Sequence, residues 1–173
     1  MLNAIYLSLG SNLGDRSQNI LTAIQMLKEV GFNVTKKSSV YETSPWPVRD
    51  KSLNGLKGVT EQPDFLNLVL KGETKLSPEE LLKKIKSIEK TMGRETSEKW
   101  GPRIIDIDIL FYKKEILDTP SLIIPHPQLH KRAFVLVPLK EIAPRLIHPL
   151  LKKTVQQMLN NMNDKGSVLL YNK

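Results

Sequence analysis

One short segment constrains the fold and the chemistry of this chain more than any other. Residues 104–112 read Ile-Ile-Asp-Ile-Asp-Ile-Leu-Phe-Tyr, which is typical of a buried β-strand. Because successive side chains of a strand point to opposite faces, we expect Asp106 and Asp108 to point the same way and the isoleucines around them to enter the core. For an isolated Asp-x-Asp, a merely solvent-facing strand would be the better explanation. Here the strand is otherwise very apolar, aspartate is a poor strand former, and Arg103 can pair with phosphate, which together favour a functional site.

The two carboxylates predict a site for hard cations. About 7 Å apart along the strand, they can hold one or two such ions at the edge of a pocket. Magnesium keeps several waters and binds through one or two carboxylates plus substrate phosphates, so the protein has to supply little else. The sequence has no G-x-x-x-x-G-K-[ST] loop, and no G-x-G-x-x-G follows the first expected strand. A bound nucleotide would therefore be held by arginines and metal ions.

The rest of the chain predicts an alternation of strands and helices. Apolar, β-branched and aromatic runs predict strands at residues 3–10, 32–42, 65–70, 104–112, about 122–124 and about 167–171. Helical spacing and helix-end signals predict helices around 20–27 before Gly31, from the Ser77 cap to Gly93, over 132–142 with Pro138 kinking or ending it, and at about 154–163. This order predicts an α+β fold, a ferredoxin-like αβα sandwich with a mainly antiparallel sheet flanked by helices, in a single domain over residues 1–173.

Composition excludes some classes of protein and leaves others open. The chain has no cysteine, which excludes disulfides and thiolate metal sites, and its net charge is +8. Such a charge suits nucleic acid or a small polyanion such as a nucleotide, and lysines that only keep the surface soluble explain it equally well. No apolar run approaches the ~18 residues of a membrane span, and the N-terminus does not read as a signal peptide. We therefore expect a cytoplasmic protein that does not contact a membrane.

Several other residues are candidates whose pattern alone leaves two explanations. His126, between two prolines, is more often a structural residue than a ligand-binding one. Trp100 and Phe134 are explained by a core position or by a slot for a flat heterocycle. Asn67, inside an apolar run, needs partners for its carbonyl and its amide, and either neighbouring backbone or the edge of a bound heterocycle would supply them. Residues 44–63, rich in proline and glycine, predict a long loop, and loops of this length in compact domains are usually functional.

Seven segments, taken in their order along the chain, form a pattern of motifs. They are Leu9-Gly10-Ser11-Asn12-Leu13-Gly14-Asp15, Tyr41-Glu42-Thr43-Ser44-Pro45, Gln62-Pro63-Asp64-Phe65-Leu66-Asn67, Gly93-Arg94, Trp100-Gly101-Pro102-Arg103-Ile104-Ile105-Asp106-Ile107-Asp108, Pro125-His126-Pro127 and the stretch from Arg132 to Leu139. In this order they resemble the 6-hydroxymethyl-7,8-dihydropterin pyrophosphokinase family over nearly the whole chain. The resemblance implies a ferredoxin-like monomer that uses ATP as co-substrate with two magnesium ions. Its implied reaction moves diphosphate from ATP to the hydroxymethyl group of the pterin, with release of AMP, in folate synthesis.

The resemblance also implies roles for individual residues. The metal pair is Asp106 and Asp108. The residues implied to surround the pterin, with its ring between the two phenylalanines, are Thr43, Ser44, Pro45, Trp46, Phe65, Asn67 and Phe134. Those implied on the ATP side are Glu89, Arg94, Trp100, Arg103, Ile109, His126 and Arg132. The residues expected to carry catalysis are Arg94, Arg103, Asp106, Asp108 and Arg132.

The sequence departs from the family pattern in two places. The loop at residues 48–61 is longer than in many members, and Thr96 and Lys99 occupy a stretch that often carries more arginines. A lysine offers a point charge without the bidentate fork of arginine, so the way the triphosphate is clamped is an open question. Two rival hypotheses are a basic RNA-binding module, which needs exposed aromatics on its sheet, and a nucleotide-sugar transferase, for which the chain is short. On the pyrophosphokinase hypothesis the partners are ATP and the pterin, and not nucleic acid.

Overall fold

The computed structural model describes residues 4–45, 62–93, 101–162 and 168–172. Its main sheet contains β1 (Ile5–Ser11), β2 (Asn33–Lys37), β3 (Tyr41–Thr43), β4 (Phe65–Glu73), β5 (Asp106–Tyr112) and β8 (Val168–Leu170). The strand order is β5-β1-β4-β3-β8, with β2 also paired to β4, and every pairing among these strands is antiparallel. A small second sheet pairs β6 (Leu117–Asp118) with β7 (Ile123–Ile124).

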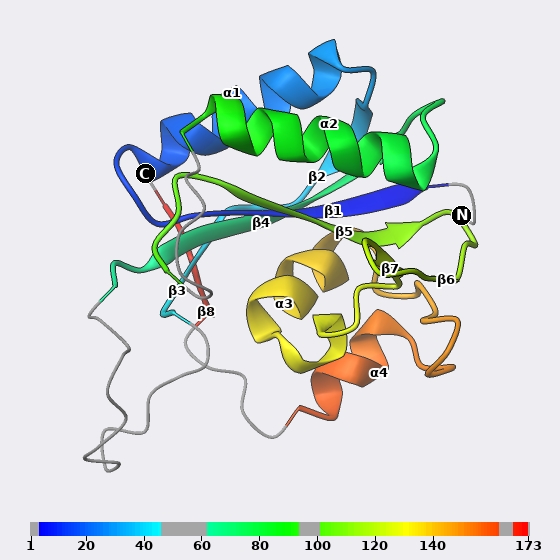
Figure 1. The fold of residues 1–173 in the computed structure, drawn as a ribbon. Coiled ribbons are helices and arrows are strands. Elements are labelled where there is room, and N and C mark those ends of the chain that lie inside the picture. The colour runs from blue at the N-terminus through cyan, green and yellow to red at the C-terminus, as the bar shows by residue number, and fades with distance from the viewer. Residues whose placement is uncertain (1–3, 46–61, 94–100, 163–167, 173) are drawn as a thin grey trace.

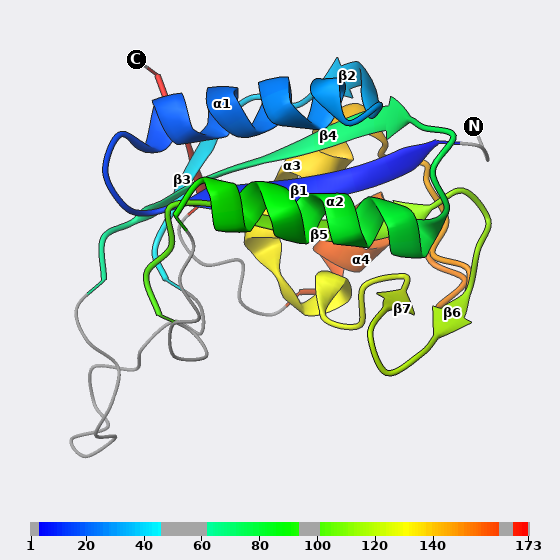
Figure 2. The same cartoon turned by 45° about the horizontal axis from the view of Figure 1, so that its top comes forward.

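Helices cover both faces of the main sheet. The helices are α1 (Arg16–Glu29), α2 (Pro78–Thr91), α3 (Ala133–Ile142) and α4 (Val155–Asn160), with a 3-10 turn at Leu129–Lys131. Figure 1 shows α1 and α2 above the sheet and α3 and α4 below it, and Figure 2 shows α1 and α2 lying side by side across the strands. The predicted α+β class with helices on both faces of an antiparallel sheet is confirmed. None of the helices in the described ranges is long and apolar enough to cross a bilayer.

Two apolar cores lie on the two faces of the sheet. Leu7 and Leu9 of β1 belong to the cluster under α1 and α2, while Tyr6 belongs to the cluster that includes residues of α3 and α4. Strand β4 alternates in the same way, because Leu68 faces the first cluster and Val69 the second. Both faces of β1 are buried, and its apolar residues Ile5, Tyr6, Leu7 and Leu9 accordingly serve both cores.

The β5 strand confirms the direction expected for its aspartates. Its odd-numbered isoleucines at 105, 107 and 109 all pack in the cluster under α1 and α2. Further along, Tyr6 pairs with Phe111 and Leu7 with Ile109, so Leu110 is the extra residue of a β-bulge. Below that bulge the alternation is regular, and Asp106 and Asp108 point to the opposite face, the one covered by α3.

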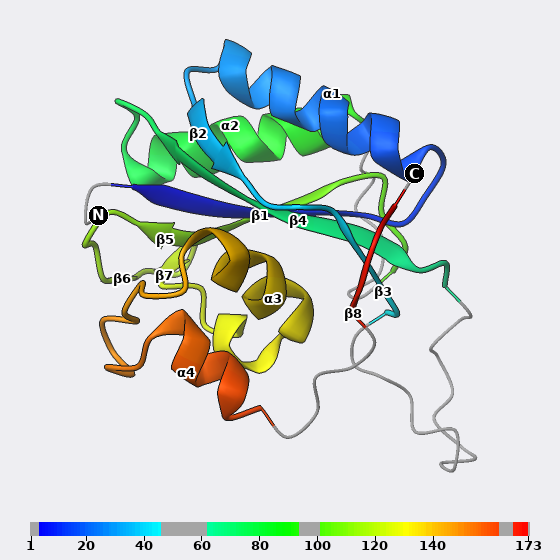
Figure 3. The same cartoon turned by 180° about the vertical axis from the view of Figure 1, so that it is seen from behind.

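The ends of the elements differ from the sequence prediction in informative ways. The helix after Ser77 begins as expected, with a capping box between Ser77 and Glu80. The strand expected at 32–42 is two strands, because Ser38 exchanges hydrogen bonds with Val69 through both its main chain and its hydroxyl and so interrupts the ladder. Pro138 does not end α3, which continues to Ile142. The last helix is shorter than 154–163, and the final strand, β8, lies at the sheet edge beside β3 (Figure 3).

Candidate active site

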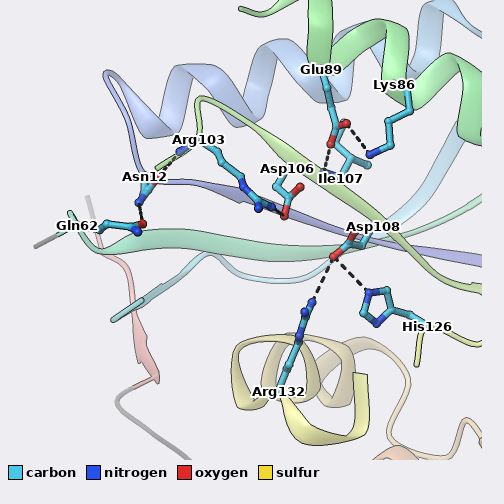
Figure 4. Close-up of polar contacts among 10 residues, drawn as sticks. All are labelled: Asn12, Gln62, Lys86, Glu89, Arg103, Asp106, Ile107, Asp108, His126 and Arg132. Atoms are coloured by element: carbon cyan, nitrogen blue, oxygen red, sulfur yellow. Dashed lines mark hydrogen bonds and ion pairs between the residues drawn. The ribbon is translucent and has the colours of Figure 1, made fainter. Parts of the chain in front are cut away.

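Asp106 and Asp108 lie at the start of the edge strand β5 and point together toward α3 (Figure 4). Their side chains are 24% and 32% exposed, so both are open to solvent while still held in the protein. The strand register aligns Asp106 with Gly10 of β1, and Gly10 in turn with Asn67 of β4. Because all three face the α3 side, the sheet brings the predicted metal pair and a predicted pterin residue onto one surface. Their separation is two strand spacings, about 10 Å.

Arg103 contacts the first of the two carboxylates. Its Nη1 lies 2.7 Å from Asp106 Oδ2. The main chain of Arg103 is fixed by Asn12, whose side-chain Oδ1 accepts from Arg103 N at 2.6 Å and whose own N–H donates to Arg103 O at 3.0 Å. The Asn12 amide also donates to Gln62 Oε1 and to Pro63 O, at 3.3 and 3.2 Å. Asn12 therefore joins the segment before β5 to the segment before β4.

Arg132 and His126 face the second carboxylate. Arg132 Nη1 lies 3.5 Å and His126 Nε2 lies 3.7 Å from Asp108 Oδ2. Figure 4 shows both side chains reaching Asp108 from the α3 side of the sheet. His126 Nδ1 accepts a hydrogen bond from Gln128 N at 3.2 Å, so the ring proton of the neutral tautomer is on Nε2, toward Asp108. Burial, and next the charge of Arg132, lower the pKa of His126 to about 4, so the ring is neutral at neutral pH.

The electrostatics of the pair fit a cation. Burial, followed by the charge of Asp106, raises the pKa of Asp108 to about 6, although Arg132 acts in the opposite direction. Near neutral pH two ionised carboxylates therefore face the same partly buried space, and a hard cation between them would relieve their repulsion. Among the described residues no group of three or more histidine, aspartate or glutamate side chains gathers in metal-binding geometry. The two aspartates fit a divalent ion that takes most of its ligands from phosphate and water; their role as ligands stays a prediction.

Glu89 and Ile109 lie on the other side of β5. Glu89 extends from α2 and is 2% exposed; its Oε1 accepts from Ile107 N at 2.9 Å and its Oε2 lies 2.9 Å from Lys86 Nζ. The Ile107 main chain therefore points to the outer edge of the sheet, and so does that of Ile109, two residues on. Since the Ile109 side chain is in the core, a contact from Ile109 to a nucleotide would have to use its main chain.

The residues predicted for the pterin gather around Asn67. Asn67 Nδ2 donates to Thr43 Oγ1 at 2.7 Å, and both side chains are buried. A Cβ atom on Gly10 would lie 2.8 Å from Asn67 Oδ1 and 3.6 Å from the Phe65 ring, so a larger residue here would have to displace the Asn67 side chain. Phe134, on α3, packs beside Arg132, whose guanidinium carbon is 5.7 Å from the ring centroid.

Some predicted residues cannot be placed. Ser44 and Pro45 follow β3 at the end of a described range. Trp46, Arg94 and Trp100 lie outside the described residues, as do the 48–61 loop, Thr96 and Lys99. The stacking of a ring between Phe65 and Phe134 stays a prediction.

Two residues of the site were given no role by the sequence prediction. Asn12 lies in a polar turn that looks like a simple connection, and nothing in its local pattern predicts contacts with residues 50 and 91 positions away. Lys86 did leave a signal, because its spacing of three from Glu89 places the two charges side by side on a helix.

Comparison with known proteins decides between the hypotheses. The sequence model for 7,8-dihydro-6-hydroxymethylpterin-pyrophosphokinase (HPPK) matches residues 6–144. The chain belongs to this family. A 2-amino-4-hydroxy-6-hydroxymethyldihydropteridine pyrophosphokinase of Aquifex aeolicus is 48% identical over 153 residues, 88% of each chain. The Bacillus subtilis protein of the same name is 41% identical over 143 residues, 82% of this chain and 79% of that one. These matches support the pyrophosphokinase hypothesis and not the RNA-binding one.

Other relatives of the HPPK family are much longer proteins. The folic acid synthesis protein FOL1 of Dictyostelium discoideum is 43% identical over 96% of this chain, which spans only 23% of that protein. A crystal structure of Plasmodium falciparum HPPK-DHPS superposes with a TM-score of 0.69 at 20% identity, over 91% of this chain and 45% of that one. At that identity the superposition supports the fold alone.

Proposed function

We propose that this HPPK-family chain transfers the diphosphate of ATP to 6-hydroxymethyl-7,8-dihydropterin. The hydroxymethyl oxygen forms a bond to the β-phosphorus, the bond from that phosphorus to the oxygen bridging to the α-phosphorus breaks, and AMP leaves with that oxygen. The hydroxyl proton is released. The observation that carries the proposal is that Asp106, Asp108 and Asn67 share one face of the sheet, with Gly10 of the strand between them.

Asp106 and Asp108 would hold magnesium, two ions in the full complex. When bound, magnesium would neutralise the triphosphate, polarise the β-phosphorus and lower the pKa of the attacking hydroxyl. Support comes from the chemistry of the donors: two carboxylates directed to one face, in a setting that raises the pKa of Asp108 and so favours a bound cation. The pair leaves most of an octahedral ion's positions to phosphate oxygens and water.

Arg103 and Arg132 would bind and orient the phosphates. Each guanidinium carries five N–H donors in a planar fork, so it can contact a carboxylate and a phosphate at the same time. One arginine lies at each aspartate, 2.7 Å from Asp106 and 3.5 Å from Asp108. Neutral His126, with its proton on Nε2, would donate to a phosphate oxygen and would not compete for the cation. This set aligns the reactants and stabilises the charge that spreads over the transferred group.

Thr43 and Asn67 would recognise the heterocycle. One amide hydrogen of Asn67 is used by Thr43, so the second hydrogen and the carbonyl can meet the donor and acceptor groups along a pterin edge. Phe65 and Phe134 would stack on the ring from β4 and α3. The protein is expected to act as a single-domain monomer, and a cytoplasmic location is part of the same proposal because both substrates are small polar molecules.

The test is pterin-dependent release of AMP. Wild type with magnesium, ATP and the reduced pterin should release AMP and no ADP, which separates this activity from that of an ordinary kinase. Asp106→Ala should lower the rate at least about 100-fold while the domain stays folded, because it removes a group needed in the transition state. Asp118→Ala is the matched control, since Asp118 is an exposed residue of β6. Near-normal turnover in Asp106→Ala would refute the metal assignment.

A further inference from the structure

Glu89 is a charged group in an unusual place. Its side chain is 2% exposed, and burying a carboxylate is costly unless it is paired and hydrogen-bonded. Two contacts lower that cost: Ile107 N donates to Oε1 at 2.9 Å, and Lys86 Nζ lies 2.9 Å from Oε2. Ile107 is the residue between Asp106 and Asp108. The buried Glu89 carboxylate is therefore bonded to the main-chain N–H of the residue that separates the two predicted metal ligands.

The edge position of β5 explains why such a contact is needed. Strand β5 pairs with β1 on one side, and in the part of the chain that the structure describes no strand pairs with its other side. The Ile107 N–H points to that outer side and is buried under α2. Left without an acceptor, a buried N–H destabilises the fold, and an edge strand with an unsatisfied donor is free to shift. Glu89 takes the place of a neighbouring strand at this one position.

Lys86 is the ion-pair partner of the Glu89 carboxylate, at 2.9 Å. The lysine is 57% exposed, so its ammonium is hydrated on one side while it contacts Glu89 on the other. An ionised acceptor makes a stronger hydrogen bond to a main-chain N–H than a neutral one does. Figure 4 shows the contacts from Lys86 to Glu89 and from Glu89 to Ile107. The side chains of Lys86 and Glu89 extend down from α2, whereas those of Asp106 and Asp108 lie on the opposite side.

We propose that Glu89 is a positioning residue for the metal pair. Its carboxylate, held by Lys86, fixes the Ile107 N–H and through it the directions in which Asp106 and Asp108 leave the strand. The catalytic consequence rests on the proposed function, whereas the hydrogen bond and its effect on β5 do not. In this role Glu89 acts on the sheet from the α2 side.

The substitutions Glu89→Gln and Glu89→Ala separate this role from a direct contact with ligand. Glutamine keeps a carbonyl oxygen that accepts from Ile107 N–H but has no charge, whereas alanine keeps neither. A positioning role predicts that Glu89→Gln retains most of the function and that Glu89→Ala loses it. A role through charge, toward a cation or a phosphate-bound metal, predicts that the two variants fail equally.

Two measurements carry the test. The first is amide hydrogen exchange at Ile107 by NMR, without any ligand: Glu89→Ala should exchange at least about tenfold faster, and Glu89→Gln less than about threefold faster. The second is Mn²⁺ affinity by electron paramagnetic resonance with a non-hydrolysable ATP analogue present. Removing a residue that orients metal ligands costs about 10–100-fold, so that loss is expected for Glu89→Ala and less than about threefold for Glu89→Gln.

Lys86→Met provides a milder variant if Glu89→Ala does not fold. It should weaken Mn²⁺ binding and speed exchange at Ile107 by about threefold or more, because the buried carboxylate then loses its ion pair with Lys86 and is drawn away from Ile107 N toward water, which a neutral glutamine is not. Lys84→Met, at an exposed lysine of the same helix, is the control. The proposal is overturned if Glu89→Gln binds Mn²⁺ as poorly as Glu89→Ala while Ile107 stays protected, or if Lys86→Met matches Lys84→Met in both measurements. Wild type without pterin-dependent AMP release would refute the proposed function, and exchange at Ile107 would still decide the positioning role.

Discussion

At the scale of single residues, Asp108 is in an environment that favours binding over stability. Burial and the neighbouring Asp106 raise its pKa to about 6, so its ionised form is disfavoured in the protein without ligands. An aspartate whose folded pKa lies above its unfolded value stabilises the fold fully below about pH 4 and loses that contribution as the pH rises to about 6. At neutral pH the ionised side chain therefore destabilises the free protein, and a bound cation would reverse this.

We predict that Asp108→Asn stabilises the ligand-free protein and removes its activity. Asparagine does not titrate, so the advantage of the variant should grow between about pH 4 and pH 6 and then stay constant. The gain in the free energy of unfolding should reach on the order of 1–2 kcal/mol, a value reduced because the Asp108 side chain is 32% exposed to solvent. Urea unfolding of both proteins at several pH values in EDTA measures it. The lowered pKa of His126 makes the free energy of unfolding change with pH in the opposite direction. That change is present in both proteins, so it cancels from the difference between them. A variant less stable than wild type at pH 7 would contradict the prediction.

Single residues also mark what sequence reasoning could and could not supply. The common direction of Asp106 and Asp108 follows from the two-residue repeat of a strand and was predictable. The contacts of Asn12 were not, because they join segments that come together only when three strands pair. Glu89 was assigned to the nucleotide side by resemblance alone, and its burial against Ile107 depends on how α2 packs over the edge of the sheet.

At the scale of elements, the site depends on how the ends of neighbouring strands are joined. Asn12, just after β1, bonds to Arg103 before β5 and to Pro63 before β4. The segment carrying Arg103, predicted to bind phosphate, and the segment leading to the residues predicted for the pterin are thus held by one buried side chain.

Asn12→Ala should disturb both substrate sites together. It leaves the partly buried main-chain N–H of Arg103 without its acceptor, so we expect a loss of about 1 kcal/mol in the free energy of unfolding. Displacement of Arg103 should lower kcat by about 10–100-fold, since small misplacements of a catalytic group have effects of that size. Steady-state kinetics and chemical unfolding measure the two effects. Asn33→Ala, at an exposed asparagine of β2, is the control, and equal kinetics in the two variants would exclude a linking role for Asn12.

Elements were predictable where a local signal decides them. The capping box at Ser77 and the apolar run of β1 depend on near neighbours in the sequence. The break between β2 and β3 does not, because it depends on Ser38 bonding to Val69 of a strand that follows much later in the chain. Pro138 remains inside α3 because packing of that helix against the sheet offsets the hydrogen bond that proline cannot donate.

At the scale of the whole molecule, the fold class was predictable from the order of elements, and the family comparisons agree with it. The chain covers most of its Aquifex aeolicus relative, yet it matches only a part of FOL1. The same kind of domain thus occurs in proteins of about this size and in much longer ones. The net charge of this chain, +8, suits the binding of a polyanionic nucleotide.

Nucleotide binding should stabilise the whole chain only when a divalent cation is present. A ligand at 100 times its dissociation constant adds about 2.7 kcal/mol, which for a chain of this size raises Tm by about 5–10 °C. We expect that shift with magnesium and a non-hydrolysable ATP analogue, and a much smaller one with the analogue in EDTA. Differential scanning calorimetry measures it. An equal shift in EDTA would show that the analogue binds without the metal and would contradict the cation site.

The alignment of Asp106, Gly10 and Asn67 across three adjacent strands has a consequence for the chemistry. The span between the predicted metal pair and Asn67, predicted for the pterin, is set by the hydrogen-bonded repeat of the backbone. Loops around the site can therefore differ in length without altering that span. The glycine of the middle strand leaves room for the Asn67 side chain, which lies over it.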